Sequence, residues 1–180
     1  NIFSGLVLGT IFLLFFPALA PTHGATKMQM LTDRSFEIGS GNSFTYWTVG
    51  SGSANPIRSG FDSYEGSKSA LSIADGYAKW MKQNFSDATH YYYLSFYARI
   101  TGTYDNKEIH VYLYDDGIEE WSVTNVAPTD SDWTLFQYTV GSMEIDEIKF
   151  YFEGGSTSQG LAIDYASLHW WYEGEPSPPP

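Results

Sequence analysis

Seven side chains that could bind a ligand recur at alternating positions of three strand-like segments. They are Tyr97, Arg99, His110, Tyr112, Tyr114, Lys149 and Tyr151. A sugar ring has apolar C–H faces that stack on aromatic rings, and hydroxyl groups that need hydrogen-bond partners. Tyrosines interspersed with Arg, His and Lys offer both. The pattern predicts a carbohydrate-binding face, and a protein-binding face or an ordinary solvated surface are the alternatives.

Catalytic constellations are poorly represented. The chain has no Gly-x-Ser-x-Gly, His-Glu-x-x-His or Walker sequence. Its histidines lack metal-pair spacing, and acid pairs such as Asp115-Asp116 fall in expected turns. The prediction is that the protein is not an enzyme. Spacing alone leaves open a glycosidase whose two carboxylates are brought together by the fold.

The candidate residues lie on strand-like runs separated by turn residues, as in β-sandwiches and barrels. The expected strands cover residues 35–38, 44–49, 56–61, 69–74, 78–85, 91–100, 108–114, 119–125, 134–140, 147–152 and 161–169. Within 91–100, Leu94, Phe96 and Ala98 alternate with Tyr97 and Arg99. Each such strand has one apolar face for a core and one mixed face. The predicted fold is therefore an all-β sandwich of two antiparallel sheets.

The composition of the chain limits the classes of ligand that it can bind. The net charge of −12 and the lack of a basic patch argue against nucleic acid and anionic surfaces. The chain has no cysteine, which excludes disulfides and thiolate metal sites.

The two ends differ from the body. Residues 2–20 carry no charge, and as a helix they would span roughly 28 Å, near the thickness of a bilayer's hydrocarbon. The expectation is a hydrophobic segment over 1–21, either a retained membrane anchor or a secretory signal. A linker over 22–34, a sandwich over 35–173 and a Pro-rich tail over 174–180 follow. In both readings the body is exported, and it lies at the cell surface or is secreted.

The ordered pieces of the body resemble carbohydrate-binding-module jelly rolls of the galactose-binding-domain-like type. The matching pieces are residues 35–39 (SFEIG), Trp47, residues 65–71 (EGSKSAL), 83–85 (QNF), 93–99 (YLSFYAR), Trp133 and 163–168 (IDYASL). The resemblance implies a jelly-roll β-sandwich, with Trp47 and Trp133 in its core. It also implies a structural calcium ion held by Glu37 and Asp164 together with loop carbonyls near Ser67 and Lys68, since Ca²⁺ takes about 6–8 oxygen ligands. The two acids as ordinary surface carboxylates are the alternative.

Two functions remain in competition. The first is a non-catalytic extracellular carbohydrate-binding module, tethered to a membrane or secreted. The second is a structural or accessory subunit of a surface filament or membrane complex, whose sandwich contacts partner proteins. Binding of glycans favours the first; a tyrosine face buried against another chain favours the second.

Overall fold

The computed structural model describes residues 27–50, 56–60, 63–73, 79–101, 108–128, 132–153 and 160–171. Its regular structure there is entirely β-strand, which confirms the all-β prediction. In this part of the chain no helix is long and apolar enough to cross a membrane. The hydrophobic segment over 1–21 and the tail over 174–180 lie outside the described residues.

The described residues form a series of strands along the chain. They are β1 (Lys27–Gln29), β2 (Gly39–Ser40), β3 (Ser43–Phe44), β4 (Thr48–Val49), β5 (Ile57–Ser59), β6 (Ser69–Ile73), β7 (Lys79–Thr101), β8 (Glu108–Asp115), β9 (Ile118–Val126), β10 (Thr134–Glu153) and β11 (Gly160–Trp171).

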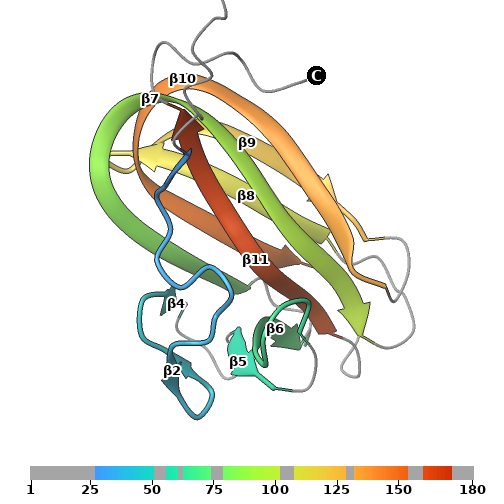
Figure 1. The fold of residues 1–180 in the computed structure, drawn as a ribbon. Helices are drawn as coiled ribbons and strands as arrows, with labels where there is room; N and C mark the ends of the chain where they lie inside the picture. Colours follow the sequence, from blue (N-terminus) through green and yellow to red (C-terminus); the bar gives the residue numbers. More distant parts are fainter. Residues whose placement is uncertain are drawn as a thin grey trace, which may run out of the picture.

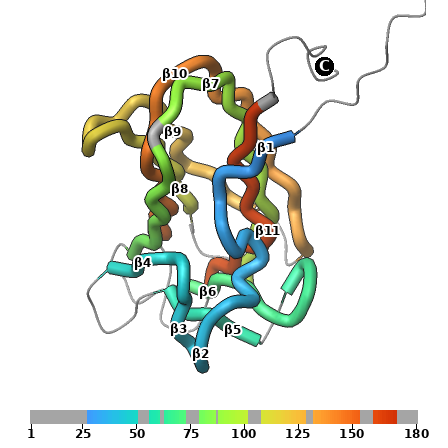
Figure 2. Tube along the Cα trace, turned by 60° about the vertical axis from the view of Figure 1, so that its left-hand side comes forward, coloured from blue at the N-terminus to red at the C-terminus, as the bar shows by residue number. Residues whose placement is uncertain are grey.

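The strands form two packed layers, and all their pairings are antiparallel (Figure 1). Layer I holds β5, β6, β11, residues 92–101 of β7 and residues 134–142 of β10, with β1 beside the end of β11 (Figure 2). Layer II holds β4, residues 79–84 of β7, residues 147–153 of β10, and then β8 and β9. The hydrogen-bonded path is continuous because β7 and β10 run through both layers.

The expected strand pairs 78–85 with 91–100, and 134–140 with 147–152, are therefore single long strands. β7 and β10 curve round together from one layer into the other (Figure 1). Register shifts between Thr139 and Gly141 and between Ile145 and Glu147 mark the bend in β10. Such bulges bend a strand and sharpen its twist. Gly141 has φ +105°, a conformation that suits glycine.

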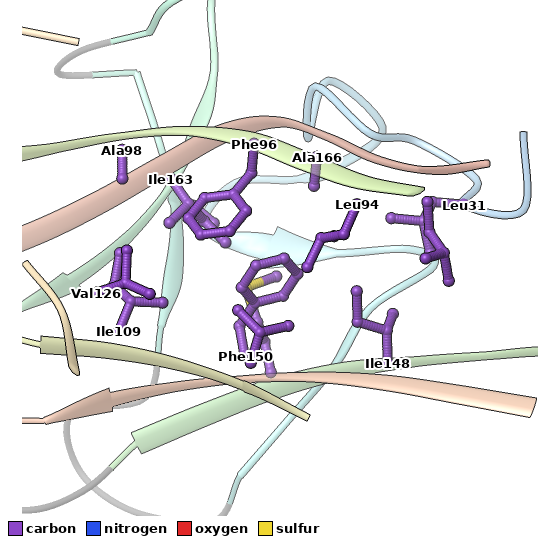
Figure 3. Close-up of a cluster of buried hydrophobic side chains, with 14 of the residues drawn as sticks. Leu31, Leu94, Phe96, Ala98, Ile109, Val126, Ile148, Phe150, Ile163 and Ala166 are labelled. Carbon is purple, nitrogen blue, oxygen red and sulfur yellow. The ribbon is translucent and has the colours of Figure 1, made fainter. Parts of the chain in front are cut away.

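The core lies between the layers (Figure 3). Phe96 and Ala98 from β7 and Ile163 from β11 face Phe150 and Ile148 from β10 (Figure 3). The Phe96 and Phe150 rings meet edge to face with centroids 5.3 Å apart. Phe150 also contacts Trp47, whose centroid is 6.0 Å away. The alternation read from the sequence is thus the alternation of buried and outward side chains.

The β-sandwich begins at Lys27, earlier than residue 35, where the sequence predicted its start. Lys27 to Gln29 pair with β11, and Leu31 is buried in the core, although both lie in the predicted linker over 22–34. The predicted strand over 35–38 is absent, because Phe36 adopts φ +57° and turns its ring into the core. Buried Arg58 stabilises this turn: its guanidinium donates to the carbonyls of Phe36, Glu37 and Gly41 at 2.8–2.9 Å.

Candidate functional site

The outward face of layer II carries a row of half-buried aromatic rings. Tyr151 of β10 lies between Trp80 of β7 and His110 of β8 in the register, and Lys149 lies between Lys82 and Tyr112. Residues paired in neighbouring strands share one face of a sheet. The platform is defined here as Trp80, Lys82, Tyr112, Tyr114, Glu147, Lys149 and Tyr151.

The platform's rings are held in contact with one another. Tyr112 meets Tyr151 edge to face with centroids 6.5 Å apart, and its ring lies 6.2 Å from that of Tyr114. The Lys149 ammonium lies 4.7 Å from the centre of a Trp80 ring and 5.2 Å from that of Tyr151. A cation over an aromatic face is attracted to it and orders both groups. A Cβ on Gly50 would overlap the Trp80 indole, so glycine there lets the indole lie against the backbone.

Charged groups on this face are largely paired. Lys82 Nζ lies 2.5 Å from Glu147 Oε2, and the Asn84 amide also donates to that oxygen. His110 is buried, accepts from the Asn125 N–H, and has its Nε2 3.1 Å from Glu153 Oε2. His110 is therefore buried against other residues of the protein, whereas the tyrosines and Lys149 remain partly exposed.

The hydroxyls of Tyr112 and Tyr114 stay protonated at neutral pH. Burial, together with the charges of Glu119 and Glu153, raises the pKa of Tyr112. Burial and the charge of Glu119 likewise raise the pKa of Tyr114. A neutral phenol both donates and accepts a hydrogen bond, as a sugar hydroxyl requires.

The sequence predicted one face, and this needs a correction. His110, Tyr112, Tyr114, Lys149 and Tyr151 come together in layer II, but Tyr97 and Arg99 do not join them. Both lie on the part of β7 that pairs with β11, so they face outward from layer I. Alternation tells inward from outward, but it does not tell which layer's outside a residue occupies. Whether any of these residues binds a ligand stays a prediction.

Glu37 and Asp164, the predicted calcium ligands, both accept hydrogen bonds from one loop. Asp164 Oδ2 accepts from the N–H groups of Tyr64 and Glu65 at 2.7 and 3.0 Å. Glu37 Oε1 accepts from the N–H groups of Ser67 and Lys68 at 2.6 and 2.8 Å. Two carboxylates thus hold the two halves of the loop over residues 64–68. We call this arrangement the loop clamp.

The pKa values of the two carboxylates of the clamp are shifted in opposite directions. Burial raises the pKa of Asp164 to about 6; hydrogen bonds from Glu65, Tyr64 and Tyr165 oppose this, and the charge of Glu37 adds to it. Burial also acts to raise the pKa of Glu37, but hydrogen bonds from Ser67 and Lys68 and the charge of Arg58 outweigh it, so that this pKa lies below its usual value. The repulsion between the two carboxylates is one that a cation would relieve.

The donor set nevertheless fits direct hydrogen bonding better than a calcium cage. The loop turns N–H groups toward the carboxylates, whereas Ca²⁺ needs several converging oxygens. Among the residues that the structure describes, no three His, Cys, Asp or Glu side chains gather as a metal site. Calcium at Glu37 and Asp164 stays a prediction.

We expect EDTA to change the melting temperature by less than the roughly 4 °C that 1 kcal/mol is worth in a domain of this size. The physical reason is that backbone N–H groups already satisfy both carboxylates. Differential scanning calorimetry in EDTA and in millimolar Ca²⁺ measures this. A larger rise with Ca²⁺, lost in Glu37→Gln, would contradict a metal-independent clamp and favour the calcium site.

Five further residues contribute to these two faces. Trp80, Lys82 and Glu147 complete the platform, and their outward parity on β7 and β10 was the available signal. Tyr64 and Trp133 lie beside Tyr97 and Arg99, and Trp133 is half-buried there, outside the hydrophobic core where the resemblance placed it. Trp47 is buried in the core, as expected. Tyr64 precedes β6 in a turn and shows no periodic signal.

Comparison with known proteins places the fold. No family model and no curated protein matches the chain. Among solved structures, it is similar to the carbohydrate-binding module TmCBM61 in complex with β-1,4-galactotriose, with TM-score 0.62 and 18% identity over 78% of this chain and 97% of that one. The fold is that of a carbohydrate-binding-module jelly roll.

Two other structures share this jelly roll at lower similarity. One is the family 11 carbohydrate-binding module from Clostridium thermocellum in complex with a β-1,3-1,4-mixed-linked tetrasaccharide, with TM-score 0.52 and 15% identity over 79% of this chain and 94% of that one. The other is the enzymatically active domain of bacteriophage CBA120 tailspike protein 4, with TM-score 0.56 and 16% identity over 80% of this chain but 21% of that one. Such a likeness establishes the fold, while function has to be argued from the site.

Proposed function

We propose that this jelly roll is a non-catalytic carbohydrate-binding domain that binds a glycan on the platform of layer II. The observation that carries the proposal is the contact set of Trp80, Lys149, Tyr151 and Tyr112 on one outward face. Aromatic rings there offer stacking surfaces for the C–H faces of sugars, and the tyrosine hydroxyls and an ammonium offer hydrogen bonds to sugar hydroxyls.

A binding role fits the charges better than a hydrolytic one. A glycosidase needs two carboxylates flanking the scissile bond, one of which is a protonated acid. Glu147 on the platform is paired with Lys82, and Glu153 at its edge lies against His110. These two carboxylates therefore have structural partners, and the tyrosines and Lys149 remain partly exposed on the same face.

We further propose that the domain works outside the cell, either attached to a membrane or secreted. The uncharged residues 2–20 support this, because a segment of that length and composition suits an anchor or an export signal. Fractionation of cells that express the full chain tests it: the domain should be accessible to added protease on intact cells, or be found in the medium.

The platform is tested by removing its rings. We expect Tyr112→Ala and Tyr151→Ala each to weaken glycan binding by about tenfold or more, since the loss of a stacking partner worth about 1.4 kcal/mol has that effect. Affinity electrophoresis in gels containing β-1,4-galactan or mixed-linkage β-1,3-1,4-glucan, followed by a glycan array, gives the measurement. The probes are chosen from the ligands of the two similar modules.

Tyr91→Ala is the matched control. Tyr91 is 48% exposed but belongs to the part of β7 that lies outside layer II, where it contacts Tyr93. Its loss should leave binding unchanged. If no glycan binds the wild-type domain, or if Tyr91→Ala weakens binding as much as Tyr112→Ala does, the platform proposal is wrong. The accessory-subunit alternative would then be the one to pursue.

A further inference from the structure

The outward face of layer I has an aromatic cluster of its own. The rings of Tyr64 and Tyr97 are stacked, with centroids 3.4 Å apart and planes at 14°. The Trp133 ring lies 6.3 Å from Tyr64 at 68°, and the Arg99 guanidinium carbon lies 5.8 Å from the Trp133 ring. These four residues form what we call the Tyr64 corner. The stacked tyrosine rings form one side of this corner, and the Trp133 ring forms the other.

Tyr64 is fixed at two points although much of it faces solvent. Its hydroxyl is hydrogen-bonded to that of Tyr97 at 2.8 Å, and its N–H donates to Asp164 Oδ2 at 2.7 Å. Its side chain nevertheless belongs to a residue that is 45% exposed. Because one face of the ring lies against Tyr97, the opposite face is the one turned outward. A ring held in this way loses little conformational entropy when a ligand stacks on it.

Forming the loop clamp costs free energy, which indicates that the position of the loop matters to the protein. Asp164 is fully buried, and burying a carboxylate is unfavourable even when hydrogen bonds compensate it. On the other half of the loop, Glu37 also accepts from the Ser67 hydroxyl at 2.9 Å. Gly66, with φ +75°, lies against the Glu37 carboxylate where a Cβ would overlap it. What these contacts jointly determine is the position of Tyr64.

We propose that the Tyr64 corner is a second carbohydrate-binding site, separate from the platform. A pyranose ring would stack its C–H face on the outward face of Tyr64 beside Trp133, and its hydroxyls would accept hydrogen bonds from the Arg99 guanidinium. The choice of a sugar rests on the proposed function of the domain. An aromatic corner with a planar donor beside it is suited to a ring that is apolar on its faces and polar at its edge.

The second site makes the domain bivalent. Tyr64 and Tyr97 lie over layer I and the platform lies over layer II, so the two sites face away from each other across the core. Two sites of this kind would engage separate glycan chains or distant segments of one chain. Binding to a polymer would then exceed binding to a short oligosaccharide through effective concentration, and either site alone would lose that gain.

Isothermal titration calorimetry tests the number of sites. The probes are the hexasaccharides of β-1,4-galactan and of β-1,3-1,4-glucan, with the matching polysaccharides in affinity gels. We expect about two equivalents for the wild-type domain and about one for Tyr64→Ala. Tyr112→Ala should retain the remaining equivalent, and the double variant should bind none. In the polysaccharide gels, each single variant should weaken binding by more than tenfold.

Two controls separate a site from a structural role. Tyr64→Phe keeps the stacked ring and loses only the hydroxyl contact, so it should retain two equivalents. Tyr91→Ala should behave as the wild type, and circular dichroism should show that each variant is folded. One equivalent for the wild type, unchanged in Tyr64→Ala, would overturn the second site while leaving the platform intact. Binding of no probe by the wild-type domain would overturn the proposed function and the corner with it.

Discussion

Replacing Phe150 with alanine is expected to lower the free energy of unfolding by about 3–5 kcal/mol. Phe150 is fully buried and contacts Phe96 across the two layers and Trp47 on the other side. Its removal takes one ring from two aromatic pairs and leaves a cavity that rigid neighbours on both layers fill poorly. Chemical denaturation followed by tryptophan fluorescence measures the change, because Trp47 reports on the same cluster.

The control for this substitution is Leu135→Ala. Leu135 is on β10 as well but is 42% exposed, and a surface change of this kind is usually worth less than about 0.5 kcal/mol. Phe150→Leu should lie between the two, because it keeps part of the volume. A loss below about 1 kcal/mol for Phe150→Ala would mean that the two layers do not depend on this contact. The neighbouring platform residues would then be positioned by other means.

Alternation predicted the core well where one face of a strand is buried. In β8, Ile109, Val111 and Leu113 are fully buried, and Tyr112 and Tyr114 point outward as expected. A shift by one residue would exchange the two faces, so the hydrophobic pattern fixes the register strongly. The same reasoning gave most of the platform, including Lys149 and Tyr151.

Residues 85–90 misled the reading of β7. Phe85-Ser86-Asp87-Ala88-Thr89-His90 has no alternation, and it predicts a break between two strands. The structure instead continues β7 through this stretch while the strand bends from layer II into layer I, and β7 pairs with β10 on either side of a register shift, at Asn84 and again at Ala88. As a result Tyr97 and Arg99 lie on the face opposite Tyr112. Alternation correctly predicted that Tyr97 and Arg99 point outward, but it does not tell to which layer they belong.

The Tyr64 corner depends on contacts between distant parts of the chain, which no local pattern shows. Asp164 and Tyr64 are 100 residues apart, and Glu37 and Ser67 are 30 apart. The resemblance implied that Glu37 and Asp164 share a calcium ion, and that site stays a prediction. The structure shows a further partner, a loop whose N–H groups point at both. Turns stabilised by long-range hydrogen bonds are the part of such a fold that sequence reasoning reaches last.

Arg58 is the residue whose loss should affect the corner most from a distance. We expect Arg58→Met to lower the free energy of unfolding by about 1–3 kcal/mol, because the buried carbonyl of Phe36 is then left without a donor. The partly buried carbonyls of Glu37 and Gly41 lose the same donor. These hydrogen bonds hold the turn that inserts Phe36 into the core and directs Glu37 at the loop of Tyr64. Thermal and chemical unfolding measure the loss.

Two variants sharpen the interpretation of Arg58. Arg58→Lys keeps the charge but replaces the planar fork with one ammonium, so it should recover little of the lost stability. Arg34→Met removes the same charge from a residue stacked on Tyr165 with its guanidinium carbon 4.1 Å from the ring, a contact worth about 0.5–1 kcal/mol. Full recovery in Arg58→Lys would show that charge, acting on Glu37, is what matters. With the fork as the cause, Arg58→Met should also weaken binding at the Tyr64 corner while the platform still binds, since only the corner depends on the loop that Glu37 holds.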